Sequence, residues 1–309
     1  MVRRIRWQPR ERREARGDAA EVGPLTIVFV HGGVSGRVRG DLPRLDYAVE
    51  AGARHGGALD AAEAAVRALE DDPTTNAGLG ATVASDGSLE LEAGIVDGGA
   101  GRFGAIANVR VRHPVSAARL VMDETPHVLL TGRGAEAFVR DRALDPLEEI
   151  TPEVRAQWEA ARRQGTLTPG HYGRSDRVDT VGAVVLDRFG TLAAASSTGG
   201  VFGKLPGRVG DSPVLGAGIY ACPEAAVVGT GVGELFVETL ACFRTAALIE
   251  QGRHPQEACE EVIRHLGARR TSSAGLLALD ASARSGAAYR GGSWGVEGPG
   301  GVVGAVRLD

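Results

Sequence analysis

The chain has 309 residues, of which 43% are hydrophobic, and its formal charge at pH 7 is −4. This length and apolar content are sufficient for a sizeable core. The slightly acidic balance gives no reason to expect a nucleic-acid partner. No apolar stretch approaches the length of a membrane-spanning helix, so we expect no membrane partner.

The cysteines and the N-terminal segment bear on the compartment. Cys222, Cys242 and Cys259 form no CxxC pair and leave one cysteine over in any disulfide scheme. This favours a reducing compartment and argues against a cysteine-based zinc site. Residues 1–24 are rich in arginine but lack the apolar segment of a signal peptide. We therefore predict a cytoplasmic protein with a disordered basic tail over 1–24 and a single domain over 25–309.

Apolar patterns in the first half predict both strands and helices. The run Leu25–Gly33 ends in His-Gly-Gly, which predicts a buried strand that enters a tight turn. Alanine, valine and leucine recur at helical spacing over Ala48–Glu70, which predicts one amphipathic helix. The other elements expected in this half are strands within Ser88–Gly98 and Arg102–Pro114, and helices over Ser116–Met122 and Thr131–Leu144.

A charged, proline-containing segment, about 145–179, separates the two halves and predicts a linker with at most one exposed helix. After it, apolar runs predict strands within 181–187, 188–200, 225–229, 274–280 and 286–294. Helical patterns cover 234–252 and 254–267. Strands and helices do not alternate strictly, which favours two sheets flanked by helices over a parallel doubly wound fold.

The glycine loop that begins at Gly229 invites comparison with dinucleotide-binding loops. The third glycine of that motif would fall at Glu234, whose carboxylate would repel a pyrophosphate. The sequence contains no GxxxxGK[ST], GxSxG or HExxH pattern. Nucleotide binding, a standard serine hydrolase and a zinc peptidase are therefore not indicated.

Thr180 stands at the entrance of a predicted strand, directly after the linker. A β-branched residue is common there, so the position alone indicates no more than a strand start. A threonine becomes a nucleophile if the peptide bond before it is cut, because the freed α-amine can take the hydroxyl proton near neutral pH. This chemistry needs an exposed segment before the threonine and a rigid strand after it, and the Asp179–Thr180 bond meets both conditions.

Several motifs share one order along the chain with a known family. They are VHGG at Val30–Gly33, NAG at Asn76–Gly78, AARLVMDETPHVLLTG at Ala117–Gly132, DTVGAVVLDRFGTLAAASSTGG from Asp179, PGRVGDSPVLGAGIYA from Pro206 and GTGVGE from Gly229. Over about Leu25–Ala305 the chain resembles the N-terminal-threonine nucleophile (Ntn) hydrolases of the plant-type L-asparaginase and isoaspartyl peptidase family. The resemblance implies an α+β fold, a four-layer αββα sandwich known as the Ntn-hydrolase fold.

The resemblance also implies an activity. The chain would cleave itself between Asp179 and Thr180 by an N→O acyl shift, and the αβ units would form a homodimer. It would then hydrolyse L-asparagine and β-aspartyl dipeptides through a β-aspartyl ester on Thr180, releasing L-aspartate without an organic cofactor. The implied residue roles are Thr180 as nucleophile, Thr198 as its hydrogen-bond partner, Thr230 and Gly231 as the oxyanion site, Arg208 and Asp211 for the substrate's α-carboxylate and α-ammonium, Gly233 as a backbone contact to substrate, and Asn76 near the nucleophile.

A structural sodium ion is implied by the same resemblance. Its ligands would be backbone carbonyls of one loop, those of Leu69, Glu70, Asp72, Thr75, Ala77 and Leu79.

Elementary chemistry supports the roles given to Arg208 and Asp211. An amino acid substrate is a zwitterion, so its site needs one fixed cation and one fixed anion, and arginine can pair with a carboxylate through two N–H groups. Taken without the resemblance, the same residues could form a surface pair, and Asp211 could be a helix N-cap.

Some positions depart from the family pattern. Asp179 replaces the glycine that often precedes the nucleophile; aspartate also occurs there in glycosylasparaginases and taspases, and STGG disfavours a taspase. Gly94 and Val232 differ from the commoner residues near the pocket. The sequence therefore leaves open the preference among L-asparagine, β-aspartyl dipeptides and glycosylasparagine. The alternatives are a glycosylasparaginase-like amidase and an uncleaved relative without catalysis.

Overall fold

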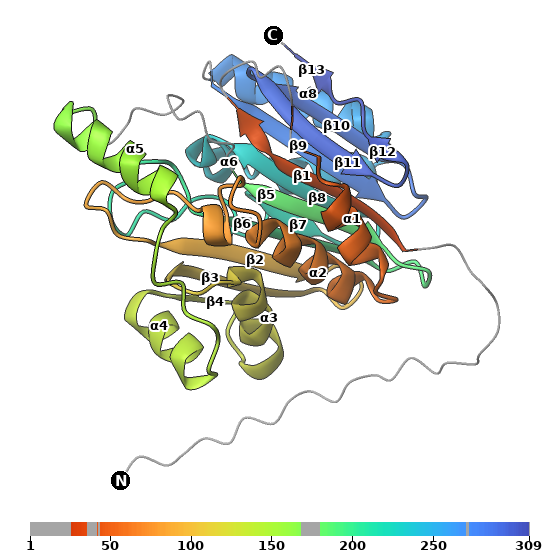
Figure 1. The fold of residues 1–309 in the computed structure, drawn as a ribbon. Coiled ribbons are helices and arrows are strands. Elements are labelled where there is room, and N and C mark those ends of the chain that lie inside the picture. Colours follow the sequence, from red (N-terminus) through yellow and green to blue (C-terminus); the bar gives the residue numbers. More distant parts are fainter. Residues whose placement is uncertain (1–25, 36–41, 43, 168–179, 270–271, 309) are drawn as a thin grey trace.

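The computed structural model describes residues 26–35, 42, 44–167, 180–269 and 272–308. Within these ranges, eight α-helices accompany two β-sheets, which confirms the predicted mixture of α and β elements with two sheets (Figure 1). The predicted basic tail, Asp179 and linker residues 168–178 lie outside the described residues. No helix in the described ranges combines the length and apolar character needed to cross a membrane.

The larger sheet has eight strands in the order β12-β11-β1-β5-β6-β2-β3-β4. Its strands are β1 Ile27–Ser35, β2 Leu91–Asp97, β3 Arg102–Val109, β4 Leu129–Thr131, β5 Val181–Leu186, β6 Leu192–Thr198, β11 Ser293–Gly298 and β12 Gly301–Val302. Every residue of β5 and β6 is buried, which accounts for the apolar runs Val181–Leu186 and Leu192–Ala195. Thr180 therefore precedes a strand at the centre of the sheet.

The smaller sheet has five strands in the order β13-β10-β9-β8-β7. Its strands are β7 Ile219–Ala221, β8 Ala225–Gly231, β9 Ala274–Asp280, β10 Ser285–Arg290 and β13 Val306–Arg307. The three-residue strand β7 was not predicted, because so short a run gives no periodic signal.

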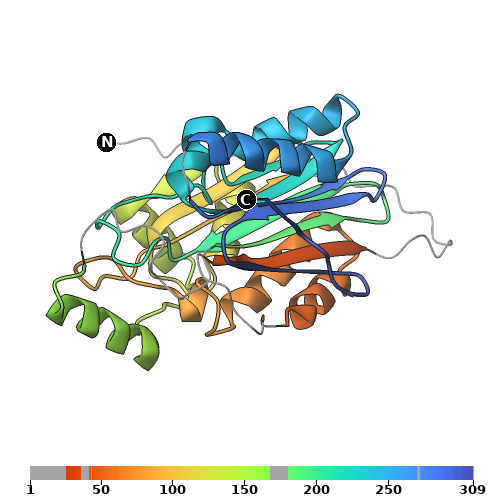
Figure 2. The same ribbon diagram turned by 90° about the horizontal axis from the view of Figure 1, so that it is seen from above.

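Helices cover the outer faces of the two sheets (Figure 2). The helices on the side of the larger sheet are α1 Asp46–Ala53, α2 Ala58–Glu70, α3 Pro114–Glu124 and α4 Gly132–Asp141. The helices on the side of the smaller sheet are α6 Gly233–Thr239, α7 Ala241–Glu250 and α8 Pro255–Arg269. The remaining helix, α5 Pro152–Arg163, is the exposed linker helix that the sequence allowed.

A third apolar cluster fills the space between the two sheets. Val184 of β5 and Ala194 of β6 belong to this cluster, whereas their neighbours Val185 and Ala195 pack on the helix side. Because side chains alternate along a strand, the even-numbered residues of β5 and β6 face the smaller sheet. This alternation determines where the site residues point.

Three predicted elements are each interrupted. The single helix predicted over Ala48–Glu70 is wrong: α1 ends at Ala53 and α2 begins at Ala58, because Gly57 is extended, with φ −109° and ψ 140°. The helix predicted over 234–252 is divided at Leu240, which has a left-handed φ of +53°. The apolar run 286–294 forms two strands, β10 and β11, separated at Gly291, which has a φ of +135°. Two of the breaks contain a Gly-Gly pair, at 56–57 and 291–292, whereas apolar residues continue across Leu240 and conceal the third.

Candidate active site

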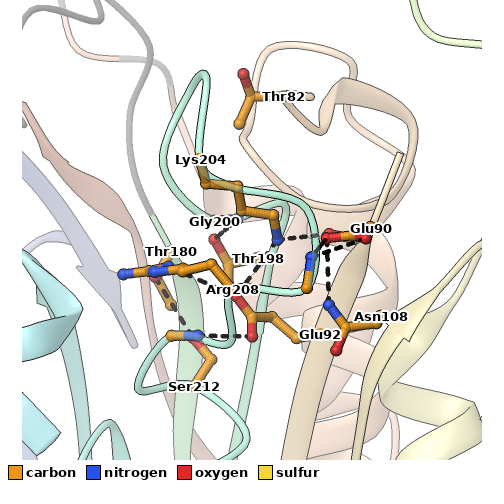
Figure 3. Close-up of polar contacts among 12 residues, drawn as sticks. Thr82, Glu90, Glu92, Asn108, Thr180, Thr198, Gly200, Lys204, Arg208 and Ser212 are labelled. Atoms are coloured by element: carbon orange, nitrogen blue, oxygen red, sulfur yellow. Dashed lines mark hydrogen bonds and ion pairs between the residues drawn. The ribbon is translucent and has the colours of Figure 1, made fainter. Parts of the chain in front are cut away.

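A row of polar residues crosses three adjacent strands of the larger sheet. The pairing of Val181 with Ser197 places Thr180 opposite Thr198, and Glu92 of β2 pairs with Thr198 from the other side. All three residues face the smaller sheet and are nearly inaccessible, with exposures of 4%, 3% and 1% for Thr180, Thr198 and Glu92. Figure 3 shows these side chains beside one another at the strand ends. The structure thus brings together the predicted nucleophile and its predicted partner.

Two further polar groups lie close to Thr180. Ser212 Oγ is 3.4 Å from Thr180 Oγ1 and donates to it. The ring of His31 lies beside Thr180, and burial lowers the pKa of His31 to about 3 against a smaller opposing effect of the Thr180 backbone. The imidazole is therefore neutral at physiological pH. Neither Ser212 nor His31 was assigned a role from the sequence.

Thr198 Oγ1 is already an acceptor, since Gly200 N donates to it at 2.9 Å. Its hydroxyl proton can therefore be donated to another oxygen in the row. This is the arrangement expected of a residue that orients a neighbouring nucleophile.

Thr230 reaches the same inter-sheet layer from the smaller sheet. The strands β5 and β8 are in contact at Gly182 and Val228, since a Cβ on Gly182 would lie 3.1 Å from Val228 Cβ. Gly182 is two residues from Thr180, and Val228 is two residues from Thr230. Thr230 Oγ1 accepts a hydrogen bond from Val34 N at 3.2 Å, which leaves the hydroxyl proton for another acceptor. Gly231, with a φ of +134°, adopts a backbone conformation that favours glycine.

Arg208, Asp211 and Gly233, the charged pair and the glycine predicted to bind substrate, lie next to one another. A Cβ on Gly233 would lie 2.6 Å from Asp211 Oδ1 and 3.0 Å from Arg208 Nη2, so the bare glycine backbone abuts both charged groups. Asp211 is 3% exposed, and its Oδ2 has no hydrogen-bond partner among the described residues. A buried, unpartnered carboxylate oxygen beside a guanidinium is suited to a zwitterion that brings its own ammonium group.

Burial raises the pKa of Asp211 to about 7, although the nearby Arg208 guanidinium acts in the opposite direction. Arg208 itself forms a two-pronged ion pair with Glu234, with Nε–Oε1 and Nη2–Oε2 distances of 3.1 Å each. This partner was missed because nothing in the sequence relates two residues that lie 26 positions apart in different elements. From the sequence alone, Glu234 was evident only as the residue that stands in place of the third glycine of a dinucleotide-binding loop.

Asn76 lies behind the site and braces the turn after Thr198. Its Nδ2 donates to Gly200 O at 2.7 Å, and its Oδ1 accepts from Thr82 N at 2.8 Å. Gly199 N also donates to the Asn76 carbonyl at 2.8 Å. Both ends of the side chain are therefore occupied by backbone groups. The structure places Asn76 against the turn that follows Thr198, with its side chain engaged in holding that turn.

Replacing Asn76 with alanine is expected to lower the free energy of unfolding by about 2–4 kcal/mol, because it leaves a buried carbonyl and a buried N–H without partners. Urea denaturation followed by circular dichroism measures the change. Asn108→Gly is a suitable control, because the Asn108 side chain joins only partly buried or exposed polar groups and glycine tolerates its left-handed φ of +55°. Equal stability of Asn76→Ala and wild type would contradict the bracing role.

The loop after α2 gathers several of the carbonyls predicted to bind sodium. Thr75 Oγ1 donates to Leu69 O at 2.7 Å and to Asp72 O at 3.1 Å, and Gly78 abuts the carbonyl of Glu70. Backbone oxygens are the kind of donor that hard cations take. The donor chemistry thus fits the predicted cation, and the sodium ion itself stays a prediction.

Comparison with known proteins identifies a set of similar chains. A family model described as “Asparaginase” matches residues 40–293. The chain is 42% identical to the isoaspartyl peptidase of Salmonella typhimurium over 277 residues, which cover 82% of this chain and 88% of that protein. It is 40% identical to the plant-type L-asparaginase of Pyrobaculum calidifontis over 280 residues, 86% and 94% of the two chains. It is 37% identical to the isoaspartyl peptidase/L-asparaginase of Mus musculus over 279 residues, 84% of each chain.

Proposed function

The chain belongs to the asparaginase family, and on this premise we propose that it hydrolyses L-asparagine and β-aspartyl (isoaspartyl) dipeptides to release L-aspartate. One observation carries the proposal: a short loop joins the charged groups to the hydroxyl. Ser212 contacts Thr180 Oγ1, and the preceding Asp211 lies with Arg208 at Gly233. A substrate whose charged end sits on Arg208 and Asp211 would therefore reach Thr180 with its side chain.

In the proposed reaction, Thr180 Oγ attacks the side-chain carbonyl of the substrate and its proton passes to the α-amine of Thr180. The Thr230 hydroxyl and the Gly231 N–H would stabilise the negative charge on the carbonyl oxygen. The leaving amine takes a proton, a β-aspartyl ester forms on Thr180, and water then hydrolyses the ester. Thr198 would orient the nucleophile throughout.

This chemistry requires a free α-amine, because an amide nitrogen cannot take the proton. We therefore propose that the chain cleaves its own Asp179–Thr180 bond by an N→O acyl shift before it acts on substrate. Support comes from the location of Thr180 at the entrance of a fully buried central strand, where its hydroxyl is held in place.

Finer features follow from the same membership. We propose an αββα layering of the Ntn-hydrolase type, supported by the three apolar clusters between helices and sheets and between the sheets. We also propose a homodimer of αβ units, a cytoplasmic location, a structural sodium ion in the loop after α2, and no organic cofactor.

Aspartate release from purified protein tests the proposal. L-asparagine and β-aspartyl-leucine are both expected to yield L-aspartate, while an aspartylglucosamine substrate is expected to yield little. Faster release from the sugar-bearing substrate would favour the glycosylasparaginase-like alternative. No release from any of the three, by a preparation that gives a single uncut band on a denaturing gel, would favour an uncleaved relative without catalysis.

A further inference from the structure

Glu92 is a buried carboxylate to which the proposed reaction gives no part. It lies on β2, directly across from Thr198 and one strand further from Thr180, and its side chain is 1% exposed. A lone buried carboxylate is costly unless cations and hydrogen bonds compensate it. The groups that compensate the charge of Glu92 therefore indicate its role.

The partners of Glu92 all belong to the loop that carries the substrate-binding pair. Gly210 N donates to Glu92 Oε2 at 2.8 Å. The other oxygen, Oε1, is 3.8 Å from Arg208 Nη1 and 3.9 Å from Lys204 Nζ. Lys204 is itself buried, with a side-chain exposure of 2%, and donates to the Glu90 carbonyl at 2.9 Å. Figure 3 shows Arg208, Lys204 and Glu92 gathered beside the two threonines.

Two glycines make this approach possible. A Cβ on Gly210 would lie 2.7 Å from Arg208 Nη1 and 3.1 Å from Glu92 Oε1. A Cβ on Gly200 would lie 2.9 Å from Lys204 Nζ. The two loops that carry the STGG and GRVGD motifs are thus packed against one carboxylate. Glu92 ties the Gly210 loop to β2 at the place where the two loops meet.

Arg208 is held between two carboxylates. Glu234 engages its Nε and Nη2, and Glu92 faces its Nη1. Without the charge of Glu92, the attraction on the guanidinium comes from Glu234 and Asp211, and no other ion pair among the described residues balances it on the Nη1 side. The group that must meet the substrate's α-carboxylate would then lose its fixed position relative to Thr180.

We propose that Glu92 is a positioning residue: it holds Arg208 and the Gly210 loop at a fixed place beside the Thr180–Thr198 row, so that the substrate's α-carboxylate and its scissile bond are engaged together. This inference rests on the proposed function. It assigns Glu92 no contact with substrate: the charge acts through Arg208, and the hydrogen bond acts through Gly210.

Glu92→Gln provides the test, because glutamine keeps the shape and one acceptor oxygen but removes the charge. With L-asparagine, KM is expected to rise about tenfold while kcat changes less than about threefold, since only the anchoring of the substrate is weakened. With L-aspartic diamide, whose α-carboxylate is replaced by an amide, the variant and wild type are expected to have equal kcat/KM. A general disturbance of the loop would penalise both substrates alike.

Glu90→Gln is the matched control. Glu90 lies two residues from Glu92 and binds the same loop through Gly207 N at 2.8 Å and 3.0 Å, without an ion pair to Arg208. Its replacement is expected to leave KM for L-asparagine within about twofold of wild type. If Glu92→Gln is not recovered folded, Glu92→Asp, which withdraws the charge by one methylene, is expected to raise KM with the same dependence on substrate.

An unchanged KM for L-asparagine, or equal losses on both substrates, would overturn the role of Glu92. A wild-type protein that releases no aspartate would overturn the proposed function instead. In that case binding of L-aspartate, measured as a thermal shift, still tests Glu92. A shift of equal size in wild type and Glu92→Gln, or no shift in either, would overturn the inference as well.

Discussion

Replacing Thr180 with alanine is expected to lower kcat for L-asparagine by about four orders of magnitude or more, as expected when a covalent nucleophile is removed. The same change is expected to leave the protein as one band on a denaturing gel, where wild type gives two. Both effects follow from one atom, because Oγ1 of Thr180 would attack first its own preceding peptide bond and later the substrate. Ammonia release and gel analysis measure the two effects separately.

Thr180→Ser is the informative companion variant. It keeps the hydroxyl that Ser212 contacts at 3.4 Å but loses the methyl group that restricts its rotation. It is expected to be cut and to retain measurable activity. Undiminished hydrolysis by Thr180→Ala would exclude Thr180 as the nucleophile, whatever the state of the chain.

Replacing Asp211 with asparagine is expected to lower kcat/KM for L-asparagine about 100-fold, mostly through KM. The variant keeps the size of the side chain but removes the anion that would accept the substrate's ammonium, and such a charge-assisted hydrogen bond contributes about 1.5–3 kcal/mol. Asp280→Asn is the control, because Asp280 is equally buried but serves the β9–β10 hairpin. Equal KM values for Asp211→Asn and wild type would remove Asp211 from the binding site.

The raised pKa of Asp211 gives this prediction a dependence on pH. With a folded-state pKa of about 7, Asp211 loses its charge as the pH falls from 8 to 6, so wild-type KM should rise over that range while that of Asp211→Asn does not. The same protonation affects stability in the opposite direction: a lower pH weakens substrate binding but raises the free energy of unfolding. The folded state holds a proton on Asp211 that the unfolded state releases near pH 4, so the contribution to stability falls as pH rises from about 4 to about 7. Asp211→Asn should therefore gain in Tm relative to wild type toward pH 8.

The sequence was informative about the groups proposed to carry out the chemistry and less so about those that hold them. Thr180, Thr198 and Thr230 stand at strand ends within recognisable motifs, and the structure places all three at the layer between the sheets. Arg208, Asp211 and Gly233 also come together as predicted. Motif order carried these assignments, because local patterns alone allow ordinary turn and strand residues at each position.

Glu92, Lys204 and Glu234 could not be identified in the same way. Glu92 looks like one polar member of an alternating strand, and a carboxylate there is usually solvated. Its burial depends on the Arg208 loop, which lies more than 100 residues further along the chain. Contacts between residues so far apart in the chain depend on how the strands are arranged in the sheet. A single sequence contains no local sign of such contacts. The two divided helices differ: the Gly56-Gly57 pair was a break visible in the sequence, whereas apolar residues continue across Leu240 and give no sign of its left-handed φ.

The order of strands in the larger sheet has a consequence for a chain cut before Thr180. Strands from the two sides of the cut interleave: β12 and β11 come from the later part, β1 from the earlier, β5 and β6 from the later, and β2, β3 and β4 from the earlier. Three backbone ladders, β11 with β1, β1 with β5, and β6 with β2, therefore join the two fragments. Fragments that share one sheet in this way would separate only by unfolding, so the stability of the cut chain is expected to depend on protein concentration. Their dissociation constant has no meaning apart from the unfolding equilibrium of the sheet itself.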